Sequence, residues 1–143
     1  MTGIIVTGHG TFARGITTAL ELVLGKQESY IDVNFPSGDT AVELEGNMTA
    51  AIDKLEGCEN IVIFADLLSG SPFNTAIMKA MKDERIKVVY GVNFGMLVEA
   101  VMERNNGKDA DDIAGNAVET GKSQIGVFNP NIVRDDEDDD EEL

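Results

Sequence analysis

The sequence is poor in the residues from which metal and thiol sites are built. Its 143 residues include one histidine, one cysteine and no tryptophan. The single cysteine, Cys58, has no second cysteine with which to form an internal disulfide, and one histidine with one cysteine does not make a zinc site. We therefore expect no metal, no cofactor and a reducing, cytoplasmic location.

Long apolar stretches and basic patches are also missing. No stretch approaches the roughly 18 apolar residues that cross a bilayer, and the N-terminus lacks the basic, cleavable pattern of a secretory signal. Lys and Arg total 11 against 26 Asp and Glu, which gives a formal net charge of −15. Because nucleic acids and many membrane surfaces are anionic, we expect neither nucleic-acid binding nor membrane insertion, and a basic protein partner suits the charge better.

The negative charge is concentrated near the C-terminal end. Residues 135–142 are all acidic and hold 8 of the 26 acidic residues, so the rest of the chain has 18 acidic and 11 basic residues. A run of like charge with nothing apolar to bury predicts disorder. We therefore predict one globular domain over residues 1–130 and a disordered acidic tail over 131–143.

Short apolar runs alternate with helical patterns along the domain. Runs rich in β-branched residues predict strands, and apolar residues spaced three or four apart predict helices. Repeated strand–helix units with short connections predict an α/β fold, with an open, mainly parallel sheet in the order 2-1-3-4 and helices on both faces. The predicted strands are 3–7, 30–35, 60–65 and 86–92, with 124–128 as a short edge strand. The predicted helices are 11–24, 40–55, 96–104 and 109–120. A further predicted helix has Ser71 as its N-cap and Pro72 at its first position.

The one histidine, His9, lies between two glycines directly after the first predicted strand. In the predicted order, strands 1 and 3 are neighbours with crossovers to opposite faces, and their carboxyl ends form the switch point where such sheets bind ligands. Asp66 follows strand 3. We therefore predict that Asp66 accepts a hydrogen bond from one ring nitrogen of His9 and leaves the other as a nucleophile.

Two predicted helices begin at the same crevice, and their starts contain the predicted phosphate-binding residues Gly10, Thr11, Gly70 and Ser71. Unpaired N–H groups and the positive end of the helix dipole favour an anion there. The sequence holds no P-loop, no Asp-rich magnesium motif and no G-x-G-x-x-G, which argues against a nucleotide. The pattern predicts that His9 carries a phosphoryl group received from another protein.

Four motifs resemble those of one known family. They are I-I-V-T-G-H-G-T-F at 4–12, D-x-x-x-G-S-P-F-N at 66–74, Y-G-V-N at 90–93 followed by M-L-V-E at 96–99, and A-V-E-T-G-K at 117–122. In order and spacing they resemble the enzyme IIA component of the mannose family of the bacterial phosphoenolpyruvate-dependent sugar phosphotransferase system. The resemblance implies a phosphotransferase whose His9 accepts a phosphoryl group from phospho-HPr and passes it to a IIB histidine, with IIC and IID as the membrane components.

The resemblance also implies roles for other segments. Asp66 would orient the imidazole, and the backbone around Gly70 and Ser71 would hold the phosphoryl oxygens. Family members form homodimers that exchange the last strand, which implies such an exchange for 124–128. Because the chain ends in an acidic tail rather than a linker, IIB is expected to be a separate polypeptide. Leu67 departs from the pattern, since some members have a hydroxyl residue there.

Four further residues are candidates for partner docking. Arg14 lies one turn into the first helix and would contact phosphate or a partner, although a solvent-facing role suits it equally. Phe35, Pro36 and Met96 lie at the carboxyl edge of the predicted sheet. They are predicted to form an apolar collar for HPr and IIB, with plain core packing as the alternative for Phe35 and Met96.

Other functions fit parts of the pattern. The phosphoryl-carrier subunit of dihydroxyacetone kinase shares the fold and a histidine after the first strand, and differs in its acceptor. A regulatory module would report the phosphorylation state of His9 to another protein. A small metal chelatase matches less well because its sites use two histidines, and a mutase-like phosphatase would want an arginine where Gly8 stands. The sequence indicates neither the sugar nor the ring nitrogen that is phosphorylated.

Overall fold

One parallel sheet organises the molecule, and its four strands lie in the order β2-β1-β3-β4. This computed structural model describes residues 1–132, so nearly all of the tail predicted at 131–143 lies outside the described residues. All three strand pairings are parallel, which confirms the predicted sheet. The strands are β1 (Thr2–His9), β2 (Tyr30–Phe35), β3 (Asn60–Ala65) and β4 (Ile86–Tyr90).

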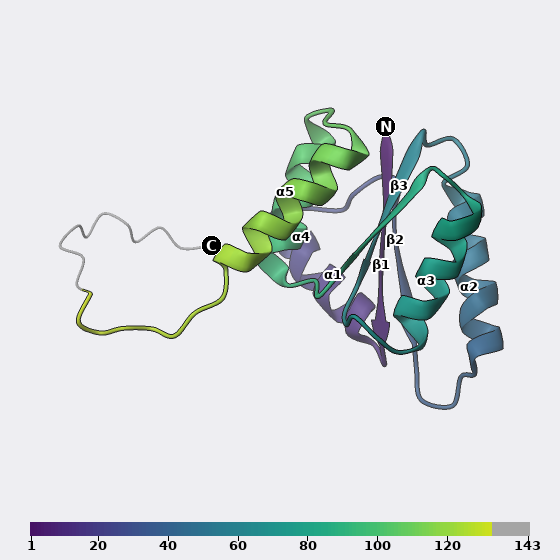
Figure 1. Ribbon diagram of the computed structural model, residues 1–143, viewed down its shortest axis with the longest axis horizontal. Helices are drawn as coiled ribbons and strands as arrows, with labels where there is room; N and C mark the ends of the chain where they lie inside the picture. Colours follow the sequence, from purple (N-terminus) through teal and green to yellow (C-terminus); the bar gives the residue numbers. More distant parts are fainter. Residues whose placement is uncertain (133–143) are drawn as a thin grey trace.

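Helices cover both faces of the sheet, as predicted (Figure 1). Alternate residues of β1 point to opposite faces, so Ile4 and Val6 join one core while Ile5 joins the other. A strand buried on both faces has no polar alternation, which explains its continuous apolar sequence. One face carries α1 (Phe12–Leu24), α4 (Phe94–Asn105) and α5 (Ala110–Ser123), and the other carries α2 (Ala41–Lys54) and α3 (Ser71–Lys82).

Two helices begin earlier than the sequence predicted. The N-cap of α3 is Gly70 rather than Ser71, because the Gly70 carbonyl accepts the N–H of Asn74 at 2.9 Å. Helix α4 starts at Phe94 rather than at 96, because the side chain of Asn93 accepts the N–H of Met96 and caps the helix there. Both caps lie at the carboxyl edge of the sheet.

Residues 124–132 follow α5 and form no strand within the single described chain. Their apolar side chains face solvent, with Ile125, Val127 and Phe128 exposed by 75%, 95% and 80%. The exchange of this segment between subunits therefore stays a prediction.

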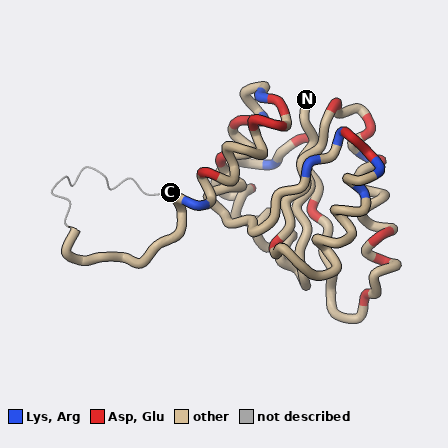
Figure 2. The backbone as a smooth tube through the Cα atoms, viewed as in Figure 1, with Lys and Arg blue, Asp and Glu red and all other residues tan. Residues whose placement is uncertain are grey.

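Figure 2 shows acidic positions along α2 and at the start of α5. Within residues 1–132, no helix has the length and apolar character to span a membrane.

Candidate functional site

His9 ends β1, and Asp66 directly follows β3, the neighbouring strand. The chain leaves β1 for α1 on one face of the sheet and leaves β3 for α3 on the other (Figure 1). The carboxyl ends of these two strands are therefore the topological switch point of the sheet. The structure brings together there the two residues that the sequence singled out.

A hydrogen bond joins the two side chains. The Nδ1 atom of His9 lies 2.9 Å from Oδ2 of Asp66, and the same oxygen accepts the backbone N–H of His9 at 2.9 Å. An ionised carboxylate only accepts hydrogen bonds, so Nδ1 carries the proton and Nε2 keeps its lone pair. The His9 side chain is 45% exposed and that of Asp66 only 13%, which leaves the imidazole open to a second molecule while its partner stays fixed.

Two glycines make this arrangement possible. A Cβ at Gly8 would come within 2.6 Å of Cδ2 of Phe12 and 3.0 Å of Oδ2 of Asp66, so a side chain there would push Asp66 from the His9 backbone. A Cβ at Gly70 would lie 2.8 Å from both Cε1 and Nε2 of His9. Gly70 also has a φ of 95°, a conformation that glycine adopts readily. The free nitrogen of His9 therefore faces backbone rather than a side chain.

Two helix N-termini adjoin His9. Helix α1 begins three residues after it, and α3 begins directly after Gly70. Among residues 1–132, the first-turn amides of Phe12, Ala13 and Phe73 make no hydrogen bond, and neither does the amide of Ser71. Because such amides and the helix dipole favour negative charge, the surroundings of His9 suit an anionic group.

The predicted docking residues lie in different settings. The ring of Phe35 meets that of His9 edge-on, with centroids 6.2 Å apart, and Pro36 follows it, half-buried. The guanidinium of Arg14 is turned along the surface to carboxylates of Glu21 and Asp32, at 3.2 and 3.4 Å. Arg14 is thus paired with residues of its own helix and of β2, not with His9.

Met96 corrects the predicted apolar collar. Its side chain is only 4% exposed and belongs to the core between the sheet, α4 and α5. Gly121 permits this burial, because a Cβ there would come 2.5 Å from Cε of Met96. This burial favours core packing, the alternative that the sequence left open for Met96, over a place in the apolar collar.

Sequence reasoning missed Asn34. Its Oδ1 accepts the backbone N–H of Arg14 at 3.0 Å, which links the end of β2 to the first turn of α1. No local sequence signal marks such a contact, because the two residues are 20 positions apart and meet only through the strand pairing.

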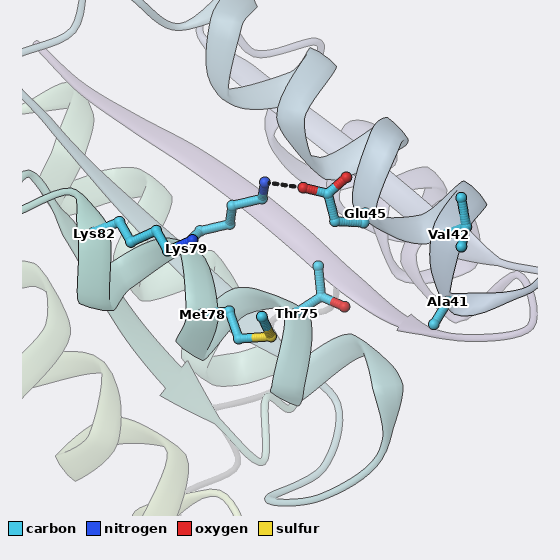
Figure 3. Close-up of a pocket in the computed structure, with 7 residues that line it drawn as sticks. All are labelled: Ala41, Val42, Glu45, Thr75, Met78, Lys79 and Lys82. Atoms are coloured by element: carbon cyan, nitrogen blue, oxygen red, sulfur yellow. Dashed lines mark hydrogen bonds and ion pairs between the residues drawn. The ribbon is translucent and has the colours of Figure 1, made fainter.

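A separate groove lies between α2 and α3 (Figure 3). Its volume is about 350 Å³, and an ion pair between Glu45 and Lys79 crosses it. Neither His9 nor Asp66 lines this groove. Within residues 1–132, no group of three His, Cys, Asp or Glu side chains is arranged to hold a metal ion.

Comparison with known proteins assigns the family. A family model described as "PTS system fructose IIA component" matches residues 3–118, which is most of the chain. The chain therefore belongs to the EIIA-man family of phosphotransferase-system IIA components. This confirms the family inferred from the four motifs, and none of the alternative functions is favoured by the comparisons.

Individual relatives agree with this assignment. The mannose-specific EIIAB component of Escherichia coli (strain K12) is 35% identical over 85% of this chain, and the chain spans only 38% of its length. The fructose-specific EIIA component of Bacillus subtilis (strain 168) is 24% identical, with 74% of this chain and 73% of that protein covered. The crystal structure of a phosphotransferase system component EIIA from Streptococcus agalactiae is 31% identical, with 90% and 98% coverage and a TM-score of 0.82.

Proposed function

We propose that this protein carries a phosphoryl group on His9 in a sugar phosphotransferase system. It accepts the group from phospho-HPr and passes it to a IIB component. The observation that carries the proposal is the state of His9, whose Nδ1 is bound to Asp66 while Nε2 faces Gly70 and the start of α3. Family membership supplies the class of donor and acceptor.

The reaction begins with attack by Nε2 of His9 on the phosphorus of the donor's phosphohistidine. The new N–P bond forms as the bond from phosphorus to the donor nitrogen breaks, and that nitrogen keeps the bonding electron pair. The proton on Nδ1 stays hydrogen-bonded to Asp66, so the positive charge that develops on the imidazole lies beside a carboxylate. Transfer to IIB is the same step in reverse, with a IIB histidine as the nucleophile.

Positioning and anion stabilisation are the main contributions of the protein, because a transferring phosphoryl group needs little covalent help. We assign the phosphoryl oxygens to the backbone amides from Thr11 to Ala13 and to the backbone at Gly70 and Ser71, with the Ser71 hydroxyl as a further donor. The predicted Gly10 donates its N–H to the Phe35 carbonyl at 2.8 Å and so keeps a role in fixing the turn. Leu67 offers no hydroxyl, and its side chain is 52% exposed. The two helix starts supply positive potential, and the nearby Arg14 is paired with Glu21 and Asp32.

A homodimer belongs to the same proposal. Strand β4 is an edge of the sheet, and a groove of about 600 Å³ runs beside it. Tyr90, Val118 and Ile125 are among the residues that line this groove. The exposed apolar segment 124–128 of a second copy would pair with β4 and cover both surfaces. A cytoplasmic location also stays a proposal.

The transported sugar is left open. The names of related proteins include mannose, fructose and sorbose, and sugar recognition in such a system belongs to membrane components. We therefore propose a sugar phosphotransferase function without naming the sugar.

Intact mass measurement tests this function. The protein is incubated with phosphoenolpyruvate, enzyme I and HPr, and His9→Ala is treated in parallel. We expect a gain of one phosphoryl group in the wild type that requires HPr and is absent from His9→Ala. Phosphorus-31 NMR of the product should place the group on Nε2. An unmodified wild-type protein would contradict the proposal and direct attention to the dihydroxyacetone-kinase alternative.

A further inference from the structure

Helix α1 begins without a side-chain cap of its own. Thr11 occupies the N-cap position, but its side chain makes no capping hydrogen bond. By contrast, Asn93 and Asp109 each cap the helix that follows them with a side-chain oxygen. The uncapped start matters because α1 begins only three residues after His9, so movement of its first turn would move the phosphoryl site.

The missing cap is supplied from β2. Oδ1 of Asn34 accepts the N–H of Arg14 at 3.0 Å, and Arg14 is the third residue of α1. This is one of the amides that an N-cap side chain normally binds. Asn34 pairs with Gly8 across the strands, so its side chain starts beside the backbone that leads into His9.

Neighbouring backbone contacts fix the same turn. Gly10 and Phe35 exchange two hydrogen bonds, with the Gly10 N–H donating at 2.8 Å and the Phe35 N–H at 3.0 Å. Asp66 holds the N–H of His9 from the other side. The end of β2 therefore fixes the segment that follows His9, and Asn34 is the side chain through which it reaches α1.

We propose that Asn34 is a positioning residue for phosphoryl transfer, and this rests on the function proposed above. By binding the N–H of Arg14, it aligns the first turn of α1 and leaves the amides of Phe12 and Ala13 directed to the phosphoryl oxygens. For this role the Asn34 side chain must be uncharged as well as supply an acceptor oxygen. A carboxylate would accept the same hydrogen bond, but it would place a negative charge beside an anionic group and weaken the positive potential of the helix start.

Two substitutions separate positioning from simple helix capping. Asn34→Ala removes the hydrogen bond, and Asn34→Asp keeps it while adding a charge. For Asn34→Ala we expect kcat for transfer from phospho-HPr to fall about tenfold with KM nearly unchanged, since misaligned donors weaken the transition state more than the docking of HPr. For Asn34→Asp we expect a wild-type unfolding midpoint together with a reduced kcat, because the hydrogen bond is kept while a negative charge is added.

Asn116→Ala is the matched control. The Asn116 side chain of α5 also makes hydrogen bonds, but to Glu103 of α4, and its loss should leave kcat unchanged. A wild-type kcat in Asn34→Ala would overturn the proposal, and so would an Asn34→Asp variant with wild-type kcat at neutral pH. The second result would assign Asn34 a capping role alone, and it decides the matter even if Asn34→Ala does not fold. Failure of the wild-type protein to be phosphorylated would instead contradict the proposed function.

Discussion

The carboxyl edge of the sheet, where the strands end, and the amino edge, where they begin, each bury one polar side-chain atom. Neither atom has a hydrogen-bond partner within residues 1–132. At the carboxyl edge it is Oδ1 of Asp66, and at the amino edge it is Nη2 of Arg104. Both groups are charged, and burying a charge is costly unless other atoms compensate it. What surrounds each group differs, and the difference separates a reactive site from a structural one.

At the amino edge, Arg104 is 3% exposed and serves the backbone. Its Nη1 donates to the carbonyls of Thr2 at 3.0 Å and Ser29 at 3.3 Å, and its Nε donates to Asn105 at 2.9 Å. Burial lowers the pKa of the guanidinium from its ordinary value. The side chain therefore joins the starts of β1 and β2 to the end of α4.

At the carboxyl edge, the carboxylate of Asp66 binds a side chain, the imidazole of His9, instead. Asp66 holds an imidazole that is 45% exposed, and Gly70 leaves room for it to react. A buried charge that binds only carbonyls adds stability, whereas one that orients an exposed imidazole can control its chemistry. Substitutions at the two edges should accordingly affect different measurements.

The largest effect is expected for Asp66→Ala. Loss of the carboxylate frees the His9 tautomer and removes the charge that stabilises the imidazolium, so phosphoryl transfer should slow about 10²- to 10⁴-fold. Asp66→Asn separates these contributions, because its amide oxygen can still accept both His9 hydrogen bonds while the charge is lost. Rapid-quench kinetics should rank wild type above Asn and Asn above Ala. Equal rates in all three would remove Asp66 from the mechanism.

Gly70→Ala should slow transfer by about 100-fold or more, because the new methyl group would occupy the space beside Nε2 and displace the imidazole. Gly25→Ala is the matched control. Its φ of 84° and ψ of 175° resemble the 95° and 173° of Gly70, but a Cβ there meets nothing within 4 Å. The two variants carry similar backbone strain, so kinetics and thermal unfolding together isolate the steric contact. Similar transfer rates in the two variants would show that contact with His9 is unimportant.

Arg104→Met should show the opposite pattern. The apolar stem is retained, but the hydrogen bonds to Thr2 and Ser29 are lost, so we expect a destabilisation of about 1–3 kcal/mol in urea unfolding. Transfer kinetics at a temperature where the variant is folded should match those of the wild type. A loss of transfer rate without a loss of stability would mean that the amino edge is coupled to His9.

The sequence predicted the sheet because its signals are local and repeated. The runs at 3–7 and 60–65 are apolar on both faces, which predicts buried strands. Short connections between successive strands and helices then allow few topologies. It also predicted that His9 and Asp66 meet, because parallel neighbouring strands bring their carboxyl ends together. These inferences needed only the order of the strands.

Contacts between distant segments were harder to predict. The sequence left Met96 open between the apolar collar and the core, because its burial depends on the close approach of Gly121 from another helix. The cap that Asn34 gives to α1 depends on the register of β2 against β1. The shifted start of α3 depends on the positive φ of Gly70, which a serine–proline motif does not encode. Each of these features requires coordinates rather than spacing.

The smallest effect is expected from an apolar side chain at the rim. Leu67 follows Asp66 directly and is 52% exposed, so a protein that brings its histidine to His9 should cover it. We expect Leu67→Ser to raise KM for HPr about two- to tenfold and to leave kcat unchanged. Met102→Ser provides the control, because Met102 is similarly exposed, at 46%, near the amino-edge end of α4. A similar KM increase in both variants would point to a general surface effect, whereas an increase in Leu67→Ser alone would place HPr on the carboxyl edge.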